Sequence, residues 1–103
     1  MNIVEKGVHG FDWDDANLKK CQKHGVHIAE VEFLFHNDPA VFPDSAHSST
    51  ETRYLAVGKD STARHLFVTF TLRTRNSQVL IRPISVRYMH TKEINNYKKY
   101  ENE

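Results

Sequence analysis

The chain has 103 residues, of which 39% are hydrophobic and 26% are charged, with a net charge of +1; these values predict one folded domain over residues 1–103. Its single cysteine, Cys21, excludes an intrachain disulfide and a zinc site built on cysteine pairs, as is usual in a reducing cytosol. The opening residues lack the features of a secretory signal, and no apolar run approaches the roughly 18 residues of a membrane span, so we expect a cytoplasmic protein without a membrane segment.

The first predicted elements are a short strand around residues 11–13 and a helix near residues 14–24. Asp14 is a suitable N-cap for this helix, and Gly25 suits the left-handed residue that follows a helix end. Leu18 and Cys21 lie on one face of the helix, so we expect that face to point towards the core.

A second helix is predicted over residues 27–36, directly after the turn. Ile28, Val31, Leu34 and Phe35 recur at spacings typical of one buried helix face. A loop with two prolines follows, with a short edge strand over residues 40–42.

The second half of the chain predicts three strands and a last helix. Short turns separate the strand-like runs, which favours an antiparallel meander packed on the two helices. We expect an α+β domain with a small antiparallel sheet, two N-terminal helices and a short C-terminal helix. The runs are TRYLAVGKD, RHLFVTFTLRT and QVLIRPISVRY for the strands and TKEINNYKKY for the helix. In the predicted core, Leu66, Val68 and Phe70 pack against Leu18, Val31 and Leu34.

Positive charge is concentrated in the predicted strands. Residues 1–52 hold four lysines and arginines against nine acidic residues, whereas residues 53–103 hold ten against four. Such asymmetry favours a polyanionic partner or an oppositely charged protein. The alternative is an ordinary solvated sheet face whose arginines pair with Glu30, Glu32 or Glu51.

Strand alternation indicates which arginines share a face. Arg73 has the parity of Thr69 and Thr71, whereas Arg64 has the parity of the apolar residues. Arg82 and Arg87 differ in parity and therefore share a face only if a bulge, for which Pro83 is a suitable residue, resets the alternation.

RNA is a chemically suitable anion for such a face. Its own 2′-hydroxyl can attack the phosphate, so cleavage requires a base, an acid and cations around the phosphate but no metal. Histidines and a glutamate are candidates for the proton transfers, and a tyrosine for base stacking. These candidates are His24, His47, His65, His90 and Glu51 for proton transfer, and Tyr88 for stacking.

Other chemistry is weakly supported. The seven histidines do not form a metal-binding motif, and helix capping accounts for the acidic run that contains Asp12, Asp14 and Asp15. Cys21 is interpreted as a small core residue. We expect no metal and no cofactor.

Several motifs, taken together and in order, resemble the BrnT family of toxins of type II toxin–antitoxin systems, which are similar to RelE-type ribonucleases in fold. The resemblance extends from Phe11 to about Tyr97, with a departure at His27, where Ser or Thr is common, and another at Val86. The matching elements are Trp13-Asp14, Lys23-His24-Gly25-Val26, Asp44, His47, Glu51-x-Arg53, Gly58, Thr71-x-Arg73 and Ile84-Ser85-x-Arg87.

The resemblance implies a metal-independent ribonuclease that blocks translation. It implies a BrnA-like antitoxin with a ribbon-helix-helix module, bound as a dimer of heterodimers, and contact with DNA only through that antitoxin. The residues that carry over as catalytic candidates are His47, Glu51, Arg53, Arg73 and Arg87. The candidates for RNA binding are Lys23, His24, Arg64, Arg82, Tyr88 and His90. Two alternatives stay open: a non-catalytic domain that binds an acidic protein, and a plain single-stranded nucleic-acid binder.

Overall fold

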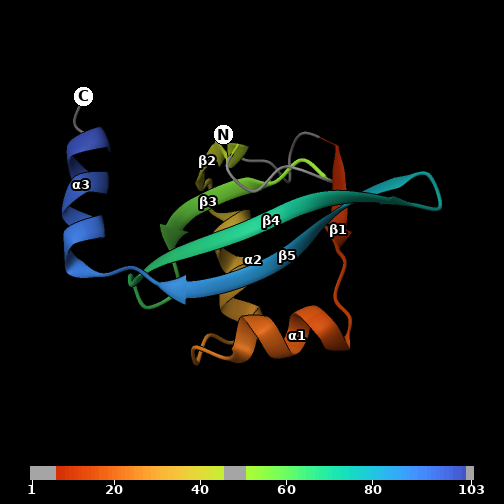
Figure 1. The fold of residues 1–103 in the computed structure, drawn as a ribbon, viewed down its shortest axis with the longest axis horizontal. Helices are drawn as coiled ribbons and strands as arrows, with labels where there is room; N and C mark the ends of the chain where they lie inside the picture. Colours follow the sequence, from red (N-terminus) through yellow and green to blue (C-terminus); the bar gives the residue numbers. More distant parts are fainter. Residues whose placement is uncertain (1–6, 46–50, 102–103) are drawn as a thin grey trace.

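A computed structural model of the protein describes residues 7–45 and 51–101. Five strands and three helices lie in these ranges (Figure 1). In chain order they are β1 (Val8–Phe11), α1 (Asp15–Gln22), α2 (Ile28–His36), β2 (Ala40–Pro43), β3 (Tyr54–Lys59), β4 (His65–Arg75), β5 (Gln78–Tyr88) and α3 (Thr91–Glu101). The predicted α+β class is confirmed, and so is the edge strand β2.

The five strands form one mixed sheet in the order β1-β5-β4-β3-β2. Strands β2 to β5 pair antiparallel with their neighbours, as predicted. The prediction of an antiparallel meander alone is wrong, because β1 adds to β5 in parallel. This strand also begins at Val8, earlier than the expected strand. Parallel neighbours need a long crossover and leave no local turn signal in the sequence. A RelE-like fold stays a prediction.

The hydrophobic core lies on one face of the sheet. Figure 1 shows α2 behind the strands and α1 along the β5 side of the sheet. Leu18, which the sequence places in the core, is only half-buried, whereas Cys21 of the same helix is fully buried. The other residues predicted to pack together are confirmed as members of one buried cluster, namely Val31, Leu34, Leu66, Val68 and Phe70.

A β-bulge in β5 changes which side chains share the other face. Thr69 pairs with Ser85, but the next residue of β4, Phe70, pairs with Pro83, so Ile84 has no partner on β4. The extra residue resets the alternation of side chains along β5. Arg82 and Arg87 therefore lie on the same face of the sheet, which is the outcome that the sequence left conditional on a bulge.

Helix α1 supports the bulge through a buried side chain. The Asn17 amide Nδ2 donates hydrogen bonds of 2.9 Å to the carbonyl oxygens of Pro83 and Asp12. Asp14 caps the same helix, as predicted, and its carboxylate accepts from the backbone N–H of Asn17. The cap and the bulge are thus joined through one residue, which fixes α1 against β5.

Candidate functional site

The face of β3, β4 and β5 opposite α2 is called the open face below. Figure 1 shows α3 beside one end of the sheet, where Tyr97 packs edge-on against His65 of β4 and Glu93 pairs with Arg87. Strand register arranges its side chains in cross-strand rows. The rows change character along the face: three hold an arginine, and the row between those of Arg82 and Arg87 is uncharged. In order, four of the rows are Arg73 with Leu80; Thr71 with Arg82; Leu55 with Thr69 and Ser85; and Val57 with Phe67 and Arg87.

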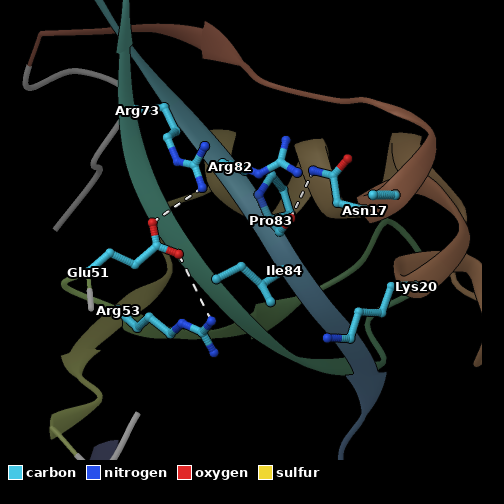
Figure 2. A pocket seen from close by; sticks show the side chains of 9 residues that line it. Asn17, Lys20, Glu51, Arg53, Arg73, Arg82, Pro83 and Ile84 are labelled. Carbon is cyan, nitrogen blue, oxygen red and sulfur yellow. Dashed lines mark hydrogen bonds and ion pairs between the residues drawn. The ribbon is translucent and has the colours of Figure 1, made fainter. Parts of the chain in front are cut away.

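A concave site, called the Glu51 pocket below, lies at the Arg82 end of the open face (Figure 2). The Glu51 carboxylate lies between two guanidinium groups, 3.3 Å from Arg73 Nη2 and 4.0 Å from Arg53 Nη2. All three side chains are partly exposed. The pocket is lined by Ala16, Asn17, Lys20, Glu51, Arg53, Arg73, Arg82, Pro83 and Ile84. Four of these side chains carry positive charge and one carries negative charge, so the pocket is suited to a phosphate.

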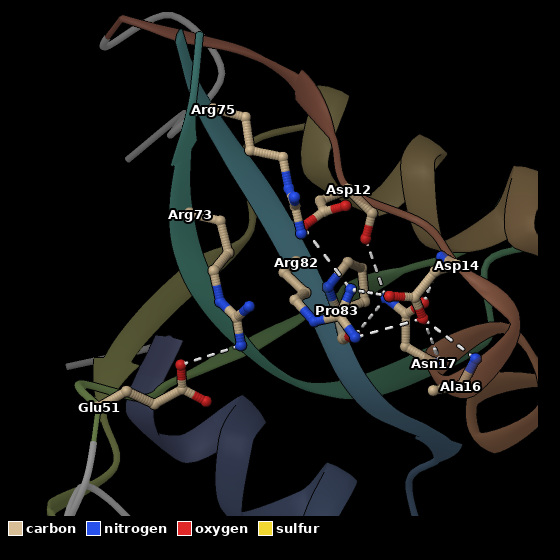
Figure 3. A network of polar contacts seen from close by, with 9 residues as sticks. All are labelled: Asp12, Asp14, Ala16, Asn17, Glu51, Arg73, Arg75, Arg82 and Pro83. Atoms are coloured by element: carbon tan, nitrogen blue, oxygen red, sulfur yellow. Dashed lines mark hydrogen bonds and ion pairs between the residues drawn. The ribbon is translucent and has the colours of Figure 1, made fainter. Parts of the chain in front are cut away.

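Arg82 is held in place from behind by acidic residues of the segment before α1 (Figure 3). Its Nη1 lies 2.9 Å from the Asp14 carboxylate and 3.6 Å from that of Asp12, and its side chain is 14% exposed. The hydrogen bond to Asp14 raises the pKa of Arg82, and the same bond lowers the pKa of Asp14. Asp12 also pairs with Arg75, at 3.0 Å. These carboxylates therefore fix a cation beside the pocket in addition to capping a helix.

Arg87, at the other end of the open face, has a carboxylate partner of its own. Its two terminal nitrogens lie 2.7 and 2.8 Å from the two oxygens of Glu93 on α3. The Arg87 hydrogen bonds, followed by one from the His90 N–H, lower the pKa of Glu93 to about 2. The guanidinium also lies over the Phe67 ring, 4.8 Å from its centre. Phe67 is six residues from Arg73 along β4, about 20 Å, so the two arginines do not meet at one phosphate.

The remaining predicted RNA-binding residues are scattered. Arg64 lies on the core side of β4, with its guanidinium carbon 3.5 Å from the centre of the Tyr88 ring. The Tyr88 hydroxyl donates to Asp60, so these side chains do not join the open face. His24 lines a hollow beside Phe67 and Arg87. Lys23 and His90 are exposed. The predicted catalytic His47 lies outside the described residues.

Sequence reasoning missed two residues of α1 that line the Glu51 pocket. One is Lys20 and the other is Asn17. A signal was present, because Lys20 lies four residues after Ala16 and so on the same side of α1, and His24 follows in the turn after the helix. All three line hollows on the same side of the sheet.

Within residues 7–45 and 51–101, no group of three His, Cys, Asp or Glu side chains is arranged to hold a metal ion. None of the helices described here is long and apolar enough to cross a membrane. Burial raises the pKa of the Cys21 thiol to about 11, which keeps it protonated at neutral pH and chemically inert.

The fold and the Glu51 pocket define a small α+β domain with a cationic, phosphate-sized site on an open sheet face. The profile of the family described as "Ribonuclease toxin, BrnT, of type II toxin-antitoxin system" matches residues 13–93. The chain therefore belongs to the BrnT family of ribonuclease toxins. The match includes the whole Glu51 pocket and extends to Glu93. No curated protein sequence matches the chain.

Proposed function

We propose that the chain is an endoribonuclease that cleaves RNA in the Glu51 pocket by attack of the substrate's 2′-hydroxyl, without a metal. The observation that carries this proposal is the Glu51 carboxylate between Arg53 and Arg73. A base flanked by two guanidinium groups supplies two of the three parts that this reaction requires, the proton acceptor and the cations around the phosphate. The ribonuclease family supports the substrate class.

In this mechanism Glu51 takes the proton from the 2′-hydroxyl while that oxygen attacks the neighbouring phosphorus. Arg73 and Arg53 bind the non-bridging oxygens, whose charge grows in the transition state. Arg82 is held in place by Asp14 and Asp12, which offset its charge, so it lines the pocket as a fixed hydrogen-bond donor. The 5′-oxygen leaves with a proton, and the product is a 2′,3′-cyclic phosphate.

The proton donor for the 5′-oxygen is not assigned among the described residues. His47, on the segment before Glu51, stays a sequence-based candidate for either proton transfer. We assign Arg87 to the anchoring of α3 beside the path of the bound RNA rather than to the cleaved phosphate, because it pairs with Glu93 and the register separates it from Arg73.

The decisive experiment uses purified chain and a labelled single-stranded RNA in excess chelator. We expect cleavage that leaves 2′,3′-cyclic phosphate ends, and no cleavage where the nucleotide 5′ to the cut carries a 2′-deoxyribose, because that nucleotide then lacks its nucleophile. Cleavage of the deoxy substrate, or strict dependence on a divalent cation, would refute the mechanism. If no RNA is cut with or without ribosomes, the arginines form a docking surface for an acidic protein instead.

We also propose that a BrnA-like antitoxin with a ribbon-helix-helix module neutralises the chain by covering the open face, within a dimer of heterodimers. An acidic segment would pair with the arginines of the Glu51 pocket, so RNA and antitoxin would compete. Growth arrest through blocked translation is the expected effect of the free chain. Competition between antitoxin and RNA in a binding assay tests this proposal, and simultaneous binding of both would contradict it.

A further inference from the structure

Between its Arg82 and Arg87 rows the open face has a hollow whose floor carries no charge, and Lys20, Asp44 and Arg53 complete its lining. The half-buried side chains of Leu55, Phe67 and Ile84 form an apolar floor, and the hydroxyl groups of Thr69 and Ser85 lie among them. No hydrogen bond between described residues uses either hydroxyl. The patch is concave, and it is continuous with the Glu51 pocket, because Lys20, Arg53 and Ile84 line both hollows.

The bulge in β5 creates much of this floor. Without the bulge, regular alternation along β5 would place Arg82 and Arg87, which are five residues apart, on opposite faces of the sheet. With it, the two arginines flank an apolar surface on one face, and the unpaired Ile84 lines both the floor and the Glu51 pocket. A fold that required only a basic face for phosphates would gain nothing from this floor.

From this arrangement we infer that Leu55, Phe67 and Ile84, with Thr69 and Ser85, form a nucleobase subsite beside the cleaved phosphate. The occupant is one unpaired base of an RNA strand, a deepening of the function proposed above on which it rests. The charge pattern selects this occupant, because cations beside a hollow with an uncharged, partly apolar floor match a backbone phosphate beside its base. The hydroxyls lie where they can bond to the edge of the base.

A nucleobase subsite on the open face restricts the class of RNA that the chain can cut. A base that lies on the sheet face has left its stack and has its pairing edge turned to protein groups, so a paired strand does not fit. The chain should therefore cut single-stranded RNA or loops and leave the same sequence intact within a duplex. A site that recognised phosphates alone would accept both forms of RNA.

The test is a set of RNA substrates in which one nucleotide has hydrogen in place of its base but keeps its 2′-hydroxyl and phosphates. The missing base is moved one position at a time across the cut. We expect kcat/KM to fall about ten- to a hundredfold at one position next to the cut, as for loss of one stacked base. Other positions should change it by less than about threefold on the same scale. An equal rate at every position would overturn the inference while leaving the proposed cleavage intact.

Protein variants provide the second arm. Ile84→Ala should weaken binding of an uncleavable RNA and reduce the penalty for the missing base, since the contact is already lost. Leu80→Ala is the matched control, because Leu80 is also a half-buried aliphatic residue of β5 and does not line the subsite. Circular dichroism confirms folding of both variants, and Thr69→Val, which removes only a hydroxyl, replaces Ile84→Ala if that variant fails to fold.

The two proposals fail in different ways. RNA that binds with a base-dependent affinity but is never cut would remove the proposed catalysis and keep the subsite. RNA that is cut equally well with and without the base, and equally well as a duplex, would remove the subsite and keep the proposed catalysis. If Ile84→Ala leaves cleavage unchanged and instead weakens antitoxin binding, the floor belongs to a protein interface and the inference is wrong.

Discussion

The two ends of the open face both hold a glutamate against arginine, but the balance of charge differs. At one end Glu51 is shared by Arg53 and Arg73, at 4.0 and 3.3 Å, with further cations lining the same pocket. At the other end Glu93 bonds through both oxygens to the single guanidinium of Arg87. A shared carboxylate leaves positive charge for a phosphate, whereas a one-to-one bidentate pair is neutral. The same residue types therefore form a candidate reactive site at one end and a helix anchor at the other.

The largest expected effect is the difference in kcat between variants of the two glutamates. Glu51→Gln removes the proposed base and keeps the shape, so kcat should fall by about 10²–10⁴. Glu93→Gln should change kcat by less than about threefold, because Glu93 pairs with an arginine far from the cleaved phosphate. Single-turnover cleavage measures both, and Glu32→Gln, on the helix behind the sheet, controls for loss of one charge. Similar losses in the Glu51 and Glu93 variants would erase the distinction between the two ends.

The next effect concerns the arginines at the two ends. Arg73→Ala should lower kcat about 10²–10³-fold, since it removes a donor to the developing charge. Arg87→Ala should lower it less than about tenfold and act mainly on KM. Steady-state measurement of kcat and KM for both variants tests whether Arg73 acts on the chemical step and Arg87 on binding. A large loss in kcat for Arg87→Ala would restore Arg87 to the catalytic group that the sequence predicted.

Features carried by one strand or one helix end could be predicted from the sequence. The parity of Arg73 with Thr69 and Thr71, the opposite parity of Arg64 and the Asp14 cap needed only local alternation and capping rules. The bulge was readable as a possibility, because Pro83 cannot donate to a ladder. The presence of the bulge decides on which face of the sheet Arg87 lies. The bulge accepts a hydrogen bond from Asn17, which lies on a different element, α1.

Features that join distant segments could not be predicted. The parallel pairing of β1 with β5 joins residues about seventy positions apart without any turn between neighbours. The pairing of Arg87 with Glu93 required the position of α3, and the role of Arg82 required the segment before α1. Each of these contacts depends on where a whole element packs, which local patterns in the sequence do not specify.

A smaller effect should appear in the salt dependence of RNA binding. Each phosphate contact adds about 0.7 to the slope of log affinity against log salt for a single strand. Arg73→Ala should reduce the slope by about this amount, and Arg87→Ala should not, while Glu93 neutralises Arg87. Glu93→Gln should raise the slope by up to about 0.7, because it frees a cation at the end of the groove. Titrations of uncleavable RNA at several salt concentrations measure these slopes, and a lower slope in Glu93→Gln would contradict the comparison.

The smallest effect is on stability, and it depends on pH. The pKa of Glu93 is lowered from 4.5 to about 2, mainly by the hydrogen bond from Arg87 and then by that from the His90 N–H. A lowered carboxylate pKa stabilises the fold above the unfolded value of 4.5 and loses this contribution as the pH falls towards 2. Because both side chains are about one-third exposed, the pair should contribute only about 0.5 kcal/mol after solvent screening.

Urea unfolding of the unmodified chain and of Glu93→Gln measures this contribution. At pH 7 the variant should be less stable by about this 0.5 kcal/mol, and the gap should narrow as the pH falls below about 4.5, since Gln at this position does not titrate. Glutamine still accepts a hydrogen bond at the start of α3, so the difference reports the ion pair rather than the loss of a helix cap. A gap that stays constant down to the lowest pH at which the chain folds would mean that Arg87 and Glu93 are not paired in solution, and Arg87 would then be available to RNA.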